Sequence, residues 1–146
     1  MNKINKTFYP DQRYSISAWY SIDCKGQQLG RLATLVTTLL RGKRKSYYHP
    51  SSRIKDKIIL LNTDLIQINP STHHYLVNNP GRPGSSLKIK KDIHEFRKFN
   101  IETAVKGMLS ATEVKYLMRN LYIYSDLNHP HIAQQVKEVN LKLINK

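Results

Sequence analysis

The sequence contains a single cysteine, Cys24. One thiol cannot form an intramolecular disulfide or a cysteine-based zinc cage, and it fits a reducing compartment. No stretch approaches the roughly 20 apolar residues that a membrane-spanning helix needs. The first residues have neither the apolar core of a secretory signal nor the Arg-rich amphipathic character of a transit peptide. We therefore expect no membrane span and no targeting segment, and a protein that works where it is made.

Acidic residues are also scarce, with 10 in 146 residues, and they are scattered. They form no pair at helical spacing that would suit two catalytic carboxylates. Residues 26–31, GQQLGR, resemble part of a phosphate loop but lack the GK[ST] ending that binds nucleotide phosphates and magnesium. These observations argue against an RNA-processing or RNA-modifying enzyme. We expect no enzyme activity and no cofactor.

Basic residues dominate the charge. The chain has 24 Lys and Arg and a formal net charge of +14, with a pI near 10.0. A folded chain of this charge repels itself unless it binds a polyanion, most commonly nucleic acid and next an anionic membrane surface. A charge run is usually only a solvated surface, but the run here also contains aromatic residues. Between Asp23 and Asp56 there is no acidic residue, and the basic ones are Lys25, Arg31, Arg41, Lys43, Arg44, Lys45, Arg53 and Lys55.

Residues 41–50, RGKRKSYYHP, form the most informative segment. They follow a predicted helix, so their cations should project from a loop fixed to a rigid element and contact phosphates. Aromatic side chains in the same segment offer flat faces for stacking on unpaired RNA bases. These side chains are Tyr47, Tyr48 and His49. The alternative is a solubilising loop with a tyrosine or two packed beneath it. We favour RNA contact, with three exposed central cations: Lys43, Arg44 and Lys45.

A second candidate segment is the loop PGRPG at residues 80–84, which holds Arg82 between prolines and glycines. Glycine lets the backbone approach phosphates closely, and proline limits the entropy lost on docking. An ordinary surface loop is the alternative, although His73, His74 and Tyr75 nearby favour RNA contact.

The histidines His129 and His131 flank a proline and can be interpreted as a metal or acid–base pair. A metal needs a third ligand, and only Asp126 is an obvious candidate. We favour imidazoles that bond to phosphate or 2′-hydroxyl groups, and we expect no metal. Cys24 stands at the end of a predicted strand, so we expect a small packed side chain and not a nucleophile.

Hydrophobic periodicity predicts alternating strands and helices. The apolar run KIILLN is typical of a strand buried on both faces of a parallel sheet. The expected strands are 18–23, 57–62 and 121–124, and a long loop over 69–86 can hold a further short strand at 74–77. The expected helices are 29–43 with Gly42 as a stop, from a Ser86 cap to 99, from an Asn100 cap to 109, and 112–120. This alternation predicts an α/β domain with a mainly parallel sheet.

The ordered series WYSIDCKGQQLGRLATLVTTLLRGKRKSYYHP, KIILLNTD, AVKGML and LYIYSDLNHPHIAQQ resembles the bacterial-type large-subunit ribosomal protein thirteen family. The resemblance covers about residues 18–135. It implies a single three-layer α/β/α domain around a short, four-stranded, mainly parallel sheet. It also implies large-subunit ribosomal RNA and neighbouring ribosomal proteins as partners, a part in early subunit assembly, and no catalysis. The family positions present here are Arg41, Gly42, Lys43, Lys45, Tyr48, Pro50, Gly107, Met108, Leu109, His129, Pro130, His131, Ala133 and Gln134.

The chain departs from the family pattern at several places. Cys24 stands where Ala is common, Ser110 replaces the proline of GMLP, and Lys55-Asp56 replaces a Gly-Asp pair. The loop NNPGRPGSS differs from the usual HTGYPGG. Lys, Asn, Ile and Tyr are abundant, which suits an AT-rich genome. Together with the expected lack of a targeting peptide, this favours a plastid-encoded member, with an AT-rich bacterium as the alternative.

The expected organisation is an N-terminal extension over residues 1–17, the domain over 18–135 and a C-terminal tail over 136–146. The extension and the loop 78–85 are polar, so we expect them to become ordered only against a partner. A regulatory RNA-binding module outside the ribosome remains a rival interpretation. The residues expected to contact RNA are Arg31, Arg41, Lys43, Arg44, Lys45, Tyr47, Tyr48, His49, His74, Arg82, Lys88, Lys106, Arg119, His129, His131 and Gln134.

Overall fold

The computed structural model describes residues 17–50, 55–68, 74–78, 81, 83, 85–89 and 93–139. For 74–78 and 85–89 only the course of the backbone is described. The predicted extension, apart from Ser17, lies outside the described residues, as do Arg82 and the end of the predicted tail.

Four parallel strands form the main sheet, in the order β5-β2-β1-β6. Strand β1 (Trp19–Asp23) pairs with β2 (Lys57–Leu61) from Trp19 opposite Lys57 to Asp23 opposite Leu61. The edges are β5 (Leu121–Ile123) and β6 (Lys137–Glu138), and β6 falls inside the segment expected to be a tail. Ile58, Ile59 and Leu60 are completely buried, because a central parallel strand is covered on both faces. The α/β class and the parallel sheet are confirmed.

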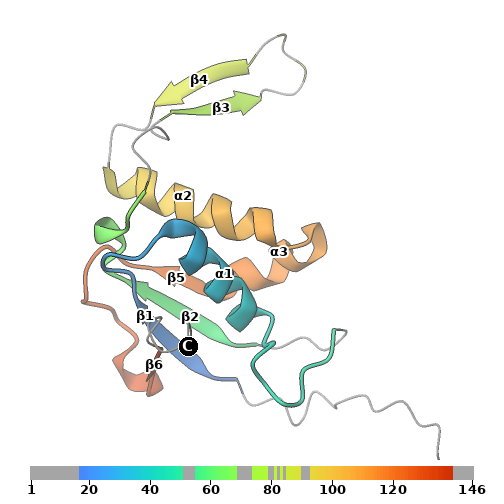
Figure 1. Cartoon of the computed structure of the whole chain (residues 1–146), viewed down its shortest axis with the longest axis vertical. Helices are drawn as coiled ribbons and strands as arrows, with labels where there is room; N and C mark the ends of the chain where they lie inside the picture. The colour runs from blue at the N-terminus through green and yellow to red at the C-terminus, as the bar shows by residue number, and fades with distance from the viewer. Residues whose placement is uncertain are drawn as a thin grey trace, which may run out of the picture.

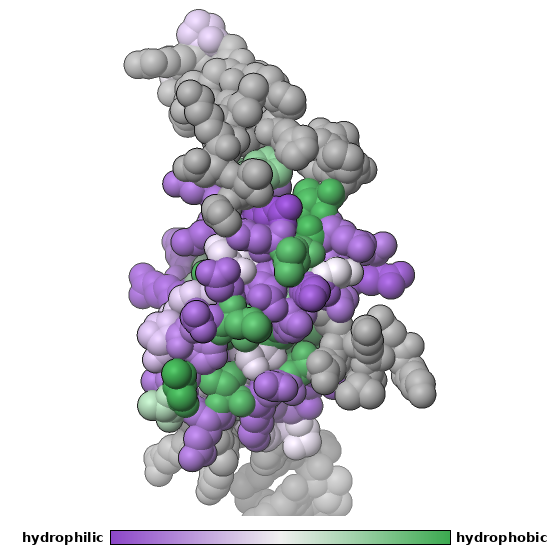
Figure 2. Space-filling model, turned by 90° about the vertical axis from the view of Figure 1, so that its left-hand side faces the viewer, coloured by the Kyte–Doolittle hydropathy of each residue, from purple (hydrophilic) through white to green (hydrophobic). Residues whose placement is uncertain are grey.

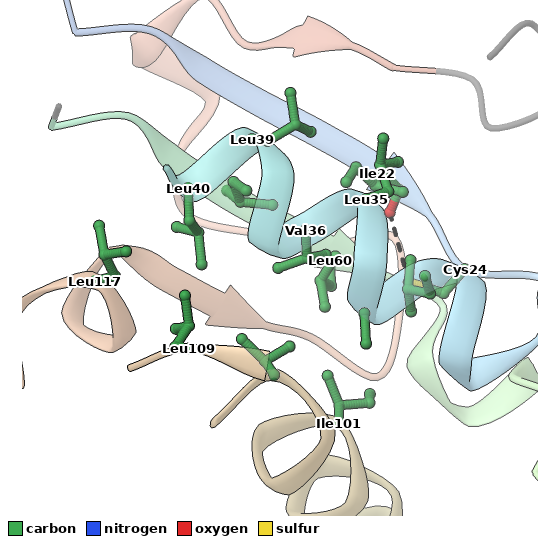
Figure 3. Close-up of a cluster of buried hydrophobic side chains, with 14 of the residues drawn as sticks. Ile22, Cys24, Leu35, Val36, Leu39, Leu40, Leu60, Ile101, Leu109 and Leu117 are labelled. Carbon is green, nitrogen blue, oxygen red and sulfur yellow. Dashed lines mark hydrogen bonds between the residues drawn. The ribbon is translucent and has the colours of Figure 1, made fainter. Parts of the chain in front are cut away.

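Helices cover one face of this sheet (Figure 1). Successive strand residues point to opposite faces, and Ile22, Ile58 and Leu60 all belong to the core shared with the helices. Helix α1 (Leu29–Leu40) contributes buried apolar side chains that include Leu32 and Val36, and α2 (Ile93–Met108) contributes side chains that include Ile101 and Val105. Figure 3 shows α1 lying between the strands and α2 within this cluster. Full burial of one such aliphatic side chain stabilises the fold by roughly 1.5–3 kcal/mol.

A loop covers the opposite face of the sheet. Trp19 and Tyr122 stack there with ring centroids 5.7 Å apart, and His131 packs against both rings. This loop contains the 3-10 turn η6 (Ile132–Gln134). The second covering layer is therefore a loop with a single helical turn. None of the helices within the described segments is long and apolar enough to cross a membrane.

The predicted helix from Ser86 to residue 99 is wrong over its first half. Strand β4 (Ser85–Ile89) pairs antiparallel with β3 (His74–Asn78), and Figure 1 shows this hairpin beyond α2, apart from the main sheet. The sequence SSLKI alternates apolar and polar residues with the period of a strand, which the helix prediction overlooked. The short strand expected at 74–77 is confirmed.

Asn100 is not a helix cap, because α2 runs through it without a break. A mid-helix Asn costs only a fraction of a kcal/mol, whereas continuity keeps the buried Phe96, Ile101 and Val105 on one packed helix. The cap lies instead at Ser110, before α3 (Ala111–Leu117), and the turn η5 (Met118–Asn120) leads from α3 into β5.

Candidate nucleic-acid interface

The loop that carries the basic segment begins at a defined helix end. Gly42 adopts φ +70°, a conformation that glycine takes without steric cost. Its N–H donates to Leu39 O at 2.8 Å, and the Lys43 N–H donates to Thr38 O at 3.1 Å. This is the Schellman pattern of helix termination, so the predicted stop at Gly42 is confirmed. Two further backbone hydrogen bonds, Lys45 N–H to Gly42 O and Tyr48 N–H to Lys45 O, fold the loop into consecutive turns.

The cations of this loop have different environments. Lys43 and Arg44 are exposed at the first turn, as expected. Lys45 is not exposed, which corrects the expectation: its side chain is only 13 % exposed. Its Nζ lies 2.5 Å from Asp56 Oδ1 and 5.6 Å from the centre of the Tyr47 ring. The sequence could not separate Lys45 from its neighbours, because its partner stands eleven residues later.

Asp56 is completely buried and stands immediately before β2. Its Oδ1 accepts hydrogen bonds from Lys45 Nζ and, at 2.9 Å, from the backbone N–H of Ala18 just before β1. Burial disfavours the charge on Lys45, but hydrogen bonds with Asp56 and Tyr47 and the negative charge of Asp56 outweigh it and raise the pKa of Lys45. The pair therefore ties the basic loop to the first residues of the two central strands.

Arg41 makes a second tie at the root of the loop. Its guanidinium donates to both carboxylate oxygens of Glu113, at 3.0 and 2.8 Å, and to Met108 O at the end of α2. Glu113 also forms a capping box with Ser110. Hydrogen bonding by Arg41, assisted by Ser110 and opposed by burial, lowers the pKa of Glu113 to about 2. Arg41 thus joins α1, α2 and α3, and its predicted contact with RNA stays a prediction.

Exposed cations gather at one end of the sheet. Helix α1 connects two parallel strands and so runs antiparallel to them, which places its last residues, and the loop, at the amino ends of the strands. Lys55 lies two residues before β2, and Arg119 lies two residues before β5. All of these side chains are exposed. We define the basic edge as Lys43, Arg44, Lys55 and Arg119.

His129 and His131 belong to the loop that packs against the second face of the sheet. His131 Nε2 lies 2.9 Å from Tyr124 Oη, and its ring centroid is 5.0 Å from that of Trp19. His129 Nδ1 accepts the backbone N–H of His131 at 3.2 Å. In the structure both imidazoles fix the loop that covers the second sheet face, and their contact with RNA stays a prediction. Both remain partly exposed.

The other predicted RNA-binding residues are dispersed. Arg31 is exposed on α1, ten residues before Arg41 and hence roughly 15 Å along the helix. Lys106 is exposed and paired with Glu102 at 3.2 Å, and Gln134 is exposed on η6. His74 and Lys88 belong to the hairpin, whose side chains are not described. Tyr47, Tyr48 and His49 are half-buried within the loop.

Sequence reasoning missed three residues at the amino end of the sheet. Lys55 was counted in the basic run but was not chosen, and its position two residues before a buried strand was the available signal. Lys57 and Trp19 were also missed: Lys57 Nζ lies 4.5 Å from the centre of the Trp19 ring. They stand opposite each other in the register of β1 and β2, which is not visible in the sequence before the pairing is known.

Comparison with known proteins identifies close similarities. The family described as ribosomal protein L13 matches residues 17–130. "Large ribosomal subunit protein uL13c" of Trieres chinensis is 38% identical over 132 residues, covering 90% of this chain and 94% of the relative. "Large ribosomal subunit protein uL13" of Pseudomonas paraeruginosa is 37% identical, covering 84% and 90%, and that of Spiroplasma citri is 36% identical, covering 88% and 90%.

Proposed function

Because the chain belongs to the ribosomal protein L13 family, we propose that it is a structural constituent of the large ribosomal subunit that binds large-subunit ribosomal RNA through its basic edge. The observation that carries this proposal is the exposure of Lys43 and Arg44 on a loop fixed at three places. Preorganised cations lose little freedom on docking, so more of their attraction to phosphate remains as binding energy.

Membership of this family supports a structural and not a catalytic role, and the environment of Cys24 agrees with it. Cys24, the most reactive type of side chain present, is completely buried. Burial, together with the nearby charge of Asp23, raises the pKa of Cys24 to about 12. A thiol in this state is not a nucleophile near neutral pH, so Cys24 serves packing.

The finer proposals concern partners, assembly and compartment. We propose that the basic edge faces RNA, that neighbouring ribosomal proteins contact other surfaces, and that the protein joins the subunit early in assembly. Depletion should then cause precursors of the large subunit to accumulate. We also propose a plastid ribosome, which is supported by the plastid-type name uL13c of a relative and by the abundance of Lys, Asn, Ile and Tyr, residues that suit an AT-rich genome. A gene on a bacterial chromosome would contradict the plastid proposal alone.

Sedimentation tests the proposed function. Extracts of the source cells are separated on sucrose gradients at high salt, and the protein is followed with an antibody. A structural constituent travels with the large subunit after the salt wash. Protein that remains near the top of the gradient would contradict a structural role and favour a module that acts outside the ribosome.

A further inference from the structure

The ion pair between Lys45 and Asp56 lies behind the basic edge, and it is more buried than a phosphate-binding lysine would need to be. Lys45 lies between two exposed cations and the aromatic part of the loop, yet its side chain is 13 % exposed and that of Asp56 is 1 % exposed. The Nζ is engaged by a carboxylate whose second oxygen, Oδ2, is buried with no hydrogen bond from the described residues. Drawing Lys45 away to a phosphate would leave this carboxylate as an unpaired buried charge.

The contacts of Asp56 show what the pair holds. Asp56 links the loop, through Lys45, to the amide of Ala18, and Lys57 beside it donates its own N–H to Ala18 O at 3.0 Å. The loop is thus fixed at the point where the chain enters β1 and β2. The backbone of Lys45 closes the turn that presents Lys43 and Arg44, through its N–H to Gly42 O at 3.0 Å.

We propose that Lys45 and Asp56 are positioning residues for RNA binding: the buried pair holds the turn that directs Lys43 and Arg44 to phosphate, and neither residue contacts RNA. This inference rests on the proposed function. It assigns a carboxylate a favourable role in binding a polyanion, which net charge alone would not suggest.

The inference makes an unusual prediction for Asp56→Asn. Removing a negative charge from an RNA-binding protein should strengthen binding if only long-range attraction matters. If Asp56 positions the loop, D56N instead weakens binding by roughly tenfold, because the side chains of Lys43 and Arg44 must then be ordered when RNA binds. Asp126→Asn is the matched control. Asp126 is exposed and follows β5 at the opposite end of the sheet, so D126N should bind as the wild type or slightly more tightly.

The experiment measures filter binding of the full chain to in vitro transcribed large-subunit ribosomal RNA, between about 50 and 200 mM salt. The variants are D56N, K45M, the double variant K45M/D56N and D126N. Thermal melting selects a temperature at which each is folded. K45M/D56N leaves no lone buried charge and serves as the test if K45M is unstable. We expect D56N and K45M to weaken binding to a similar degree, and the double variant to bind no more weakly than K45M.

Two other results are informative. Tighter or unchanged binding by D56N, together with a salt slope reduced by about 0.9 in K45M, would show that Lys45 is itself a phosphate ligand. That result overturns the inference and leaves the proposed function intact. If the double substitution K43M/R44M leaves RNA binding unchanged, the proposed RNA-binding edge fails, whatever D56N does.

Discussion

The two ends of the parallel sheet differ in which charged side chains are exposed. At the amino end, Lys45 and Arg41 are paired with Asp56 and Glu113, whereas the four cations of the basic edge are exposed. At the carboxyl end, the acidic Asp23, Asp64 and Asp126 are mixed with Lys25 and Arg31, and exposed apolar residues stand among them, including Leu65 and Leu127. Figure 2, which faces the carboxyl ends, shows separate hydrophobic groups among hydrophilic residues.

This comparison shows that the net charge of +14 does not by itself locate the RNA-binding surface. Lys45 and Arg41 stabilise the fold through their ion pairs. Because Asp56 and Glu113 are engaged in these pairs, they do not compete with RNA phosphates for Lys43 and Arg44. The account therefore predicts the largest effects on RNA binding from exposed cations at the amino end. The paired cations should affect stability and, through the position of the loop, RNA binding to a smaller degree.

The largest effect is expected for Lys43→Ala combined with Arg44→Ala. Loss of two phosphate contacts should reduce the salt slope by about 1.8 and weaken RNA binding roughly 60-fold near 0.1 M salt. Both side chains are exposed, so the melting temperature should change little. Filter binding and thermal melting check the two parts, with Lys25→Ala combined with Arg31→Ala as the carboxyl-end control. Equal losses in the two double variants would remove the distinction between the ends.

A smaller effect, on stability, is expected for Glu113→Gln. The substitution weakens the bidentate contact with Arg41 and the capping box, so it should lower the free energy of unfolding by about 1–2 kcal/mol at neutral pH. Folding lowers the pKa of Glu113 from 4.5 to about 2. Its contribution is therefore complete above pH 4.5 and is lost as the pH falls toward 2. Urea unfolding of both proteins at a series of pH values tests this, because the difference between them should vanish in acid; a constant difference would exclude the carboxylate as its source.

The smallest effect is expected for Cys24→Ala. Cys24 is completely buried, and Figure 3 shows its thiol donating to Ile22 O, at 3.7 Å. Loss of one small buried group should cost at most ~1 kcal/mol and leave RNA binding unchanged. Denaturant unfolding and filter binding measure both quantities. A marked loss of RNA binding in folded C24A would show that the thiol has a role beyond packing.

The sequence predicted best the elements whose pattern is strong and local. After Lys57, strand β2 is wholly apolar, and α1 has one apolar stripe with a glycine stop, so both were found with nearly correct bounds. Strand β6 was missed because two residues carry no periodic signal, and they form a strand only through pairing with β1. The interior of α2 was divided at Asn100 because a cap propensity was given more weight than tertiary packing.

The candidate site was predicted as a segment but not in its details. The run between Asp23 and Asp56 marked the right loop, yet the roles of Lys43 and Lys45 depend on which of them reaches Asp56. That choice follows from the turn at Gly42 and the position of β2, which are properties of the fold. The acid that ends the run, placed directly before a buried strand, was the one local signal of a buried partner.

The most direct test is cleavage of ribosomal RNA by hydroxyl radicals released from one position on the protein. Single cysteines are introduced by Arg44→Cys at the basic edge and Leu127→Cys at the carboxyl end, both in a Cys24→Ala background, and each carries a tethered iron chelate. The variants are assembled into large subunits, and the cleaved positions are mapped. The account predicts strong cleavage from position 44 and weak cleavage from position 127. Strong cleavage from position 127 with none from position 44 would contradict it.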